Sequence, residues 1–155
     1  LVTASGVCKG RLSSGDICLV DMATGLGRPG ERPTTELPAH LAIYREQEKA
    51  RAIVHTHPPH VLALDRLFED PREMLNLSLY ETDTYRERFG IVPALPPGGE
   101  KLGESVGKTA ANRQALLMRR HGLICWGETL EEALCLSEEL ENMARIRWML
   151  LAGEA

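Results

Sequence analysis

Two histidines separated by one residue close a short apolar run, where His55-Thr56-His57 follows Ala52-Ile53-Val54. Because strand side chains alternate between two faces, the two imidazoles are expected on the same face. Neutral imidazole nitrogens bind zinc and its first-row neighbours, and a catalytic zinc site commonly takes three protein ligands and leaves one position open. The pair therefore predicts part of a metal site whose third ligand comes from elsewhere in the chain.

His121 is the strongest candidate for that third ligand. It follows the apolar run 115–118 and precedes Gly122, so we expect a turn that brings its imidazole beside a neighbouring strand end. A histidine in a turn has no metal role by itself. Together with His55 and His57, however, it makes a set of three imidazoles.

Two other metal-binding folds also use an HxH pair and remain as alternatives. His55, His57 and His60 superficially resemble the HxHxDH motif of the metallo-β-lactamase fold, although Pro59 stands in the place of the aspartate. A cupin also uses an HxH pair, but it places a glutamate soon afterwards and contains few helices. We expect His40 to be an ordinary helix histidine without a metal.

The composition limits the class of protein. The chain has 155 residues, of which 43% are apolar, so one compact domain spanning 1–155 is expected. Its formal net charge of -4 comes from interspersed acidic and basic residues. It therefore lacks the basic face with which a nucleic-acid-binding protein neutralises phosphates, and no nucleic-acid partner is expected.

The cysteines and the apolar runs indicate a cytoplasmic protein. The four cysteines, Cys8, Cys18, Cys125 and Cys135, form no CxxC pair and are too sparse for a disulfide scaffold, so reduced thiols are expected. No apolar run approaches the roughly 18–20 residues that span a bilayer, and no signal peptide is recognisable, so no membrane contact is expected. Since the chain starts with Leu1, part of the natural N-terminus is expected to be missing.

The elements that must position the histidines alternate between strand and helix patterns. Strands are expected at 1–3, 16–22, 51–57, 91–95, 115–118 and 123–126. Helices are expected at 36–44, 60–68, 101–112 and 129–153, with a short helix and loop between 69 and 90. This alternation predicts a single three-layer α/β domain.

Two of these helices have distinct start signals. Thr34 and Thr35 are candidate N-caps of the helix 36–44, in which Leu37, Leu41 and Tyr44 form the predicted buried stripe and Pro38 is tolerable only in the first turn. Thr129 and Glu132 form a predicted capping box for the last helix. The apolar residues expected on its buried face are Leu130, Leu134, Leu140, Met143 and Leu150.

Four segments of the chain carry a family pattern. They are Thr3-Ala4-Ser5-Gly6-Val7, the run from Thr34 to Tyr44, His55-Thr56-His57-Pro58, and Arg120-His121-Gly122-Leu123 followed by Trp126-Gly127. In this order they resemble the class II aldolase/adducin family over nearly the whole chain. The resemblance implies a three-layer α/β/α sandwich with a central, mostly antiparallel sheet flanked by helices.

The resemblance also implies the metal ligands and the acid/base group. In the family's aldolases the HxH pair and the later HG histidine bind zinc, which assigns His55, His57 and His121 to the metal. Zn²⁺ is the leading candidate, and Mn²⁺, Co²⁺ and Fe²⁺ are the others. A glutamate that opens the helix before the HxH strand acts as acid and base, and Glu36 matches it.

The implied phosphate site involves two pairs of small residues. Thr34 and Thr35 match hydroxyl residues that bind the substrate phosphate in the family, and Ser5 and Gly6 match a second such pair. A helix N-terminus offers free N–H groups and a positive dipole end, which independently favours an anion at the threonines. The alternatives are N-capping for a threonine and a plain turn for Ser5-Gly6.

The implied activity is a lyase reaction on a phosphorylated sugar. A ketose 1-phosphate would be cleaved to dihydroxyacetone phosphate and an aldehyde through an enediolate that the metal stabilises. Relatives with this site are dehydratases, 4-epimerases or oxo-acid phosphate decarboxylases, and the adducin head is a non-catalytic interaction module. The family's aldolases also use tyrosines as proton donors, whereas this chain has no tyrosine after Tyr85. A homotetramer is a further implication of the resemblance.

Overall fold

A four-stranded sheet forms the centre of the fold. In the computed structural model, which describes residues 1–153, the strand order is β3-β6-β5-β4. The strands are β3 (Ala52–Thr56), β4 (Phe89–Val92), β5 (Ala115–Met118) and β6 (Gly122–Gly127). β6 pairs antiparallel with β3 and β5, while β4 pairs parallel with β5. The predicted, mostly antiparallel sheet is confirmed, and residues 154 and 155 of the expected domain lie outside the described residues.

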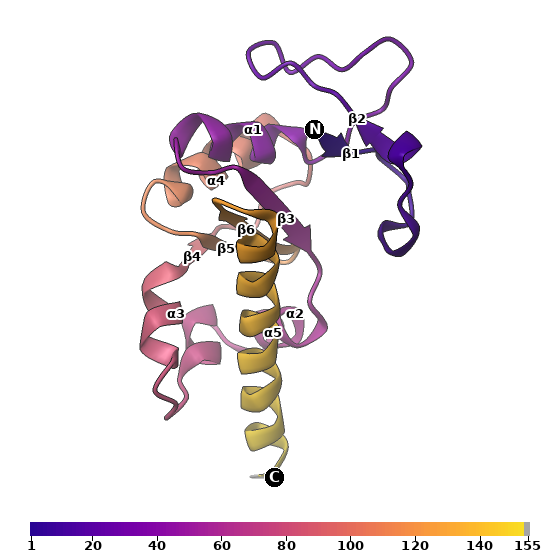
Figure 1. Cartoon of the computed structure of the whole chain (residues 1–155). Coiled ribbons are helices and arrows are strands. Elements are labelled where there is room, and N and C mark those ends of the chain that lie inside the picture. The colour runs from indigo at the N-terminus through magenta and orange to yellow at the C-terminus, as the bar shows by residue number, and fades with distance from the viewer. Residues whose placement is uncertain (154–155) are drawn as a thin grey trace.

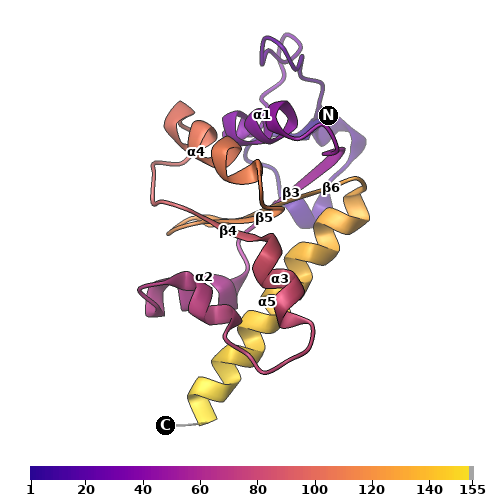
Figure 2. The same ribbon diagram turned by 90° about the vertical axis from the view of Figure 1, so that its left-hand side faces the viewer.

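Helices cover both faces of this sheet and complete the predicted three-layer sandwich (Figure 2). The helices are α1 (Leu37–Glu46), α2 (Pro59–Leu67), α3 (Thr82–Arg88), α4 (Glu100–Ala110) and α5 (Leu130–Gly153), with a 3-10 helix at Pro71–Leu75. α1 and α4 lie on one face, and α2, α3 and α5 on the other. Strand side chains alternate between the layers: Leu116 and Met118 pack in the α1/α4 layer, and Ala115 and Leu117 in the opposite one.

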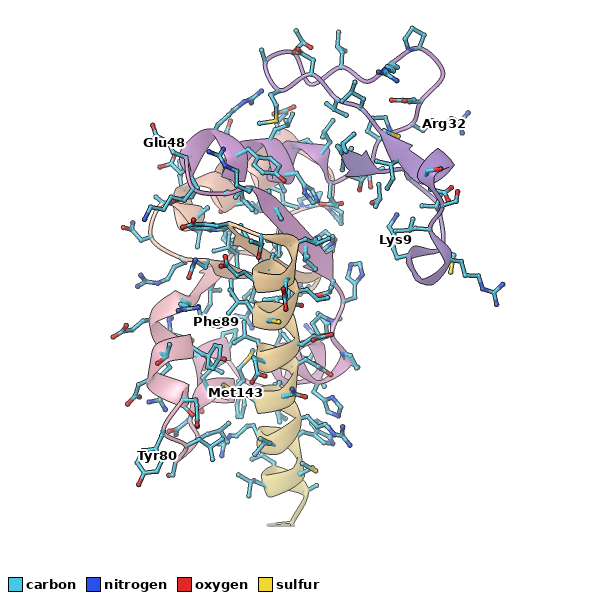
Figure 3. The ribbon with its side chains drawn as sticks, viewed as in Figure 1. Lys9, Arg32, Glu48, Tyr80, Phe89 and Met143 are labelled. Atoms are coloured by element: carbon cyan, nitrogen blue, oxygen red, sulfur yellow. The ribbon has the colours of Figure 1, made fainter. Side chains whose placement is uncertain are left out.

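The N-terminal segment stands beside the sandwich (Figure 1). It contains the antiparallel strands β1 (Val2–Thr3) and β2 (Ile17–Cys18). Figure 3 shows Lys9 and Arg32 on this segment, apart from the layers in which the buried side chain of Met143 packs. The segment returns to the sandwich just before α1, which is where the predicted phosphate-binding residues lie.

Two predicted strands have wrong boundaries. The strand expected at 16–22 ends at Cys18, because the Asp21 carboxylate accepts hydrogen bonds from the N–H groups of Ala23 and Thr24 and forms a turn. The strand expected at 91–95 is Phe89–Val92 instead. Pro93 follows it directly and has no N–H to donate to a strand ladder.

Helix α1 buries a different face from the predicted one. Ala39 and Ile43 pack against α4, whose glycines allow the two helices to approach closely. Of the predicted stripe, Leu41 is buried, whereas Leu37 and Tyr44 are half-buried and line a hollow toward the N-terminal segment. The stripe was misplaced because α1 has two apolar neighbours, the α4 helix and the N-terminal segment.

The start of α1 also differs from the prediction. Glu36 occupies the N-cap position, and no side chain caps the helix there, so the threonine N-caps are wrong. The Thr34 hydroxyl instead accepts a hydrogen bond from the Glu36 N–H over 3.3 Å. Pro38 lies in the first turn, as predicted, where its missing N–H breaks no helical hydrogen bond.

Helix α5 starts after Thr129, as predicted, but only one of the two hydrogen bonds of the predicted capping box forms, and only part of the expected stripe is buried. The Thr129 hydroxyl accepts from the Glu132 N–H over 3.1 Å, while the Glu132 carboxylate accepts from the Glu128 N–H. The buried apolar residues are Ala133, Leu136, Leu140, Met143 and Ala144. The predicted Leu130, Leu134 and Leu150 are exposed. The predicted residues lie on several faces of the helix. Hydrophobicity alone did not indicate that Ala133 and Ala144 pack against the core while larger leucines are exposed.

The cysteines are unpaired, as predicted. Cys18 and Cys125 are buried, and Cys8 and Cys135 are exposed. Burial raises the pKa of the Cys125 thiol, so it stays protonated and packs as a small apolar side chain. Within residues 1–153, no helix combines the length and the apolar character that crossing a membrane requires.

His40 on α1 is expected to make the fold sensitive to acid. Burial lowers its pKa from 6.5 to about 4, so below pH 6.5 the unfolded chain binds a proton that the folded chain does not. Stability is therefore fully present above about pH 6.5 and decreases as the pH falls toward 4. We expect His40→Gln to remove on the order of 1–3 kcal/mol of this loss, measured by urea denaturation along the pH series. An equal loss of unfolding free energy with falling pH in the parent protein and in His40→Gln would contradict the expectation.

Candidate metal centre

Three imidazoles converge at one end of the sheet. β3 carries His55, and His57 follows the strand directly, on the side where Ile53 packs in the α1/α4 layer. His121 lies in the turn between β5 and β6. One nitrogen of each ring lies within 4.8 Å of the other two, and the ring centroids are 4.8, 5.0 and 5.5 Å apart. The structure thus brings together the three histidines that were predicted as metal ligands.

A tight turn delivers His121 to this cluster. The His121 N–H donates to the Met118 carbonyl oxygen over 3.0 Å. Arg120, between them, has a φ of 62°, in the left-handed region that non-glycine residues rarely adopt. The backbone therefore reverses within three residues, and His121 faces the end of β3.

Gly122 leaves no room for a side chain beside the cluster. A Cβ there would lie 2.6 Å from the Thr56 carbonyl oxygen and 2.8 Å from a ring carbon of both His55 and His57. We expect Gly122→Ala to lower the free energy of unfolding by about 1–3 kcal/mol and to weaken metal binding. Thermal melts and metal titration measure both effects. Gly10→Ala is the control, because its Cβ would meet nothing within 4 Å, and equal behaviour of the two variants would contradict the steric argument.

Two rings of the cluster have a buried nitrogen that is available to a cation. The Nδ1 atom of His55 lies 3.0 Å from the Leu123 carbonyl oxygen, which can only accept, so Nδ1 carries the proton and Nε2 keeps its lone pair. The buried His55 Nε2 and His121 Nδ1 atoms have no hydrogen-bond partner. A buried polar atom without a partner is costly, and coordination would satisfy it.

The electrostatics keep these rings in the form that binds metal. Burial, with smaller contributions from His57 and His121, lowers the pKa of His55 to about 4. Burial also lowers the pKa of His121, and the Glu36 carboxylate opposes that shift. Both imidazoles are therefore neutral at physiological pH, with a lone pair available for a ligand bond. The donor set and its protonation fit zinc or a similar first-row cation.

Glu36 lies beside the cluster at the start of α1. Its Oε1 atom is 3.9 Å from the His121 Nε2 atom, and its Oε2 atom is buried without a hydrogen-bond partner. The residue is only 6% exposed. The carboxylate that was predicted near the three histidines thus lies beside one of them, and one of its oxygens has no hydrogen-bond partner.

The predicted phosphate-binding residues lie on two backbone segments that are hydrogen-bonded to each other, and the second segment leads to Glu36. The Thr34 N–H donates to the Thr3 carbonyl oxygen over 3.0 Å, and the Ser5 N–H donates to the Arg32 carbonyl oxygen over 2.8 Å. These bonds place Ser5 and Gly6 alongside the segment that leads to Thr34, Thr35 and Glu36. Thr35, Ser5 and Gly6 are exposed, so their polar groups are accessible to a ligand.

His60 lies outside the cluster and has a structural partner. Its Nδ1 atom is 2.6 Å from a carboxylate oxygen of Glu141 on α5, and that carboxylate also accepts from the N–H groups of His60 and Val61. Glu141 therefore accepts hydrogen bonds from N–H groups at the start of α2 that have no partner within the helix. The metallo-β-lactamase alternative is wrong for this reason, since His60 does not join His55 and His57.

Sequence reasoning missed three charged residues near His121. A hollow of about 270 Å³ is lined by Leu62, Asp65, Arg66, Arg120 and His121. Asp65 is buried, on the same face of α2 as Val61, one turn earlier. An acidic residue at an apolar helical spacing signals a buried partner, so this position could have been found, but the arginines look like ordinary surface residues.

The chain matches a family of known proteins. The family model described as "Class II Aldolase and Adducin N-terminal domain" matches residues 1–148. An L-fuculose phosphate aldolase from Methanococcus vannielii is 32% identical over 151 residues, which cover 97% of this chain and 79% of that protein. A 3-oxo-tetronate 4-phosphate decarboxylase from Escherichia coli is 33% identical over 153 residues, which cover 97% and 71%.

Solved structures agree with the fold. The crystal structure of L-fuculose-1-phosphate aldolase from Thermus thermophilus superposes with a TM-score of 0.83 at 28% identity. The match covers 98% of this chain and 77% of that one. The similarity therefore includes the sandwich and the N-terminal segment together.

Proposed function

The chain belongs to the class II aldolase and adducin family, and we propose that it is a metal-dependent lyase acting on a sugar phosphate. The proposed reaction is the retro-aldol cleavage, or the reverse condensation, of a ketose 1-phosphate, with dihydroxyacetone phosphate and an aldehyde as products. One observation carries the proposal: three imidazoles each place a nitrogen within 4.8 Å of the other two, and a buried carboxylate lies 3.9 Å from one of them.

His55, His57 and His121 would hold the cation, most simply Zn²⁺, with Mn²⁺, Co²⁺ and Fe²⁺ as alternatives. When bound, a divalent cation supplies Lewis-acid stabilisation of the negative charge that develops on the substrate oxygens. The hydrogen bond from His55 Nδ1 to the Leu123 carbonyl oxygen fixes the orientation of that ring before the cation arrives. The site is therefore preorganised by the backbone of β6.

Glu36 would move the proton in this reaction. Retro-aldol cleavage removes a proton from a substrate hydroxyl and later returns one to carbon, so one carboxylate can act first as base and then as acid. Its unpartnered Oε2 atom provides the accepting position. Because Glu36 immediately precedes the first turn of α1, the helix fixes the position of its backbone.

Thr34, Thr35, Ser5 and Gly6 would bind the phosphate. The backbone bonds between the segment 3–5 and the segment 32–34 support this proposal, since they bring the two pairs together. The N-terminus of α1 adds the positive end of the helix dipole. Phosphate at this position would place the sugar carbons toward the imidazoles.

Decarboxylation of an oxo-acid phosphate is the second candidate. Arg66 and Arg120 line the hollow that adjoins His121, and a guanidinium group is well suited to a carboxylate. A substrate with a carboxylate at one end and a phosphate at the other would use both the arginines and the threonines. A ketose phosphate without a carboxylate would leave the arginines without a role.

The other reactions of the family have no comparable observation in their favour. Dehydration and 4-epimerisation would use the same imidazoles, and an adducin-like interaction module would need no cation. The proposals of a cytoplasmic location and a homotetramer follow from the family. Sedimentation of the purified protein would measure the oligomeric state.

The decisive experiment uses the purified protein after loading with zinc, cobalt or manganese. It is incubated with ketose 1-phosphates and, separately, with 3-oxo-tetronate 4-phosphate, and products are identified by mass spectrometry. Release of dihydroxyacetone phosphate together with an aldehyde from a ketose 1-phosphate supports the aldolase. Release of carbon dioxide from 3-oxo-tetronate 4-phosphate, which also leaves dihydroxyacetone phosphate, supports the second candidate. Absence of bound metal after loading, together with no turnover, would favour the interaction module and contradict both.

A further inference from the structure

A buried carboxylate on α2 contacts the turn that carries His121. Asp65 is 2% exposed. Its Oδ1 atom accepts from the Arg119 Nε–H over 2.9 Å, and its Oδ2 atom accepts from the Arg120 N–H over 2.7 Å. Both oxygens are thus used by the two residues that immediately precede the ligand histidine.

Arg119 extends this contact to the end of α2 and to β4. Its guanidinium donates to the carbonyl oxygens of Asp65, Phe68 and Glu69 over 3.2, 3.3 and 3.0 Å. Its backbone N–H donates to the Val92 carbonyl oxygen over 3.0 Å. Arg119, which precedes the ligand histidine by two residues, therefore binds carbonyl oxygens at the end of α2 and just beyond it.

Helix α2 is also tied to the other two imidazoles. It begins at Pro59, two residues after His57, and its first N–H groups are bound by Glu141 of α5. One short helix is therefore fixed at its start, beside the HxH pair, and at its end, beside the His121 turn. This helix therefore links the two parts of the cluster, in addition to the pairing of β3 with β6.

The conformation of the turn explains why it needs such a restraint. Arg120 has a φ of 62°, which is unfavourable for a residue with a side chain and persists only where the surroundings enforce it. The hydrogen bond from the Arg120 N–H to Asp65 acts on that residue directly. Without it, the turn can relax, and His121 would move away from His55 and His57.

We propose that Asp65, together with Arg119, is a positioning residue that sets the place of His121 in the metal centre. This inference rests on the proposed metal binding. Outer partners of metal ligands commonly change metal affinity by about 10- to 100-fold when they are mutated. Here the partner acts through the backbone of the turn and makes no hydrogen bond to the imidazole.

The test measures Co²⁺ affinity and the visible absorption spectrum of the Co²⁺ protein, which reports ligand geometry. Asp65→Ala and the isosteric Asp65→Asn are compared with Val61→Ala, a control on the buried face of the same helix whose side chain makes no hydrogen bond to the turn. Asp65→Asn keeps the size of the side chain and has one accepting oxygen, so it is the variant expected to fold. We expect both Asp65 variants to bind Co²⁺ about 10- to 100-fold more weakly, with an altered spectrum. The Val61 control should match the parent protein.

Two results would overturn the inference while leaving the proposed function intact. One is parent-like Co²⁺ affinity and spectrum in Asp65→Asn, and the other is an equal loss of affinity in Val61→Ala. A parent protein that binds no Co²⁺ would overturn the proposed metal function and this inference with it. The parent titration therefore distinguishes the two failures.

Discussion

Replacement of His57 by alanine is expected to abolish stoichiometric metal binding and, with it, the proposed lyase activity. Structural zinc sites bind with about 10–16 kcal/mol from four ligands, so each ligand contributes about 2.5–4 kcal/mol, and loss of one weakens binding on the order of 100- to 1,000-fold. His57 is the most exposed of the three histidines, so this variant removes a ligand with little loss of core packing. Metal content after dialysis and turnover of the sugar phosphate measure the two effects.

His60→Ala is the matched control for this prediction. His60 is three residues away and bonds to Glu141, outside the cluster. We expect this variant to keep its metal and to lose some thermal stability, because a contact between α2 and α5 disappears. Stoichiometric zinc in the His57 variant would contradict the proposed ligand set, and loss of zinc in the His60 variant would reopen the role of that histidine.

The three imidazoles could be predicted from the sequence because each depends on a local rule. Period-two alternation places His55 and His57 on one face, and Gly122 indicates a turn at His121. The register of β6 between β3 and β5 then brings the turn beside the end of β3. That register is a property of the whole sheet, and the family pattern supplied what the local rules could not.

Other features depended on contacts that no local rule describes. Asp65 is an ordinary helix residue until the turn at Arg119 and Arg120 packs against it. The buried face of α1 is set by the glycines of α4, some sixty residues away in the chain. Pattern-based prediction identified the helices and strands but could not identify which of two apolar neighbours each face would contact.

The centre assigns metal binding and proton transfer to different residues, and Glu36→Gln tests this assignment. The three imidazoles supply the ligands, while Glu36 lies 3.9 Å from the nearest ring nitrogen and leaves one oxygen without a partner. Glutamine has nearly the same size but cannot accept a proton at neutral pH. We therefore expect kcat to fall by about 100- to 10,000-fold, while metal content and KM change little.

Proton transfer can be measured apart from bond cleavage. If the protein is an aldolase, it should exchange a carbon-bound proton of dihydroxyacetone phosphate with deuterated water, and Glu36→Gln should lose this exchange together with turnover. Glu46→Gln, at the exposed far end of the same helix, is the control that should retain both. A Glu36 variant with parent-like exchange and kcat would show that another group moves the proton. Lost metal in that variant would instead indicate that Glu36 helps to hold the cation, because the carboxylate would then be part of the ligand set.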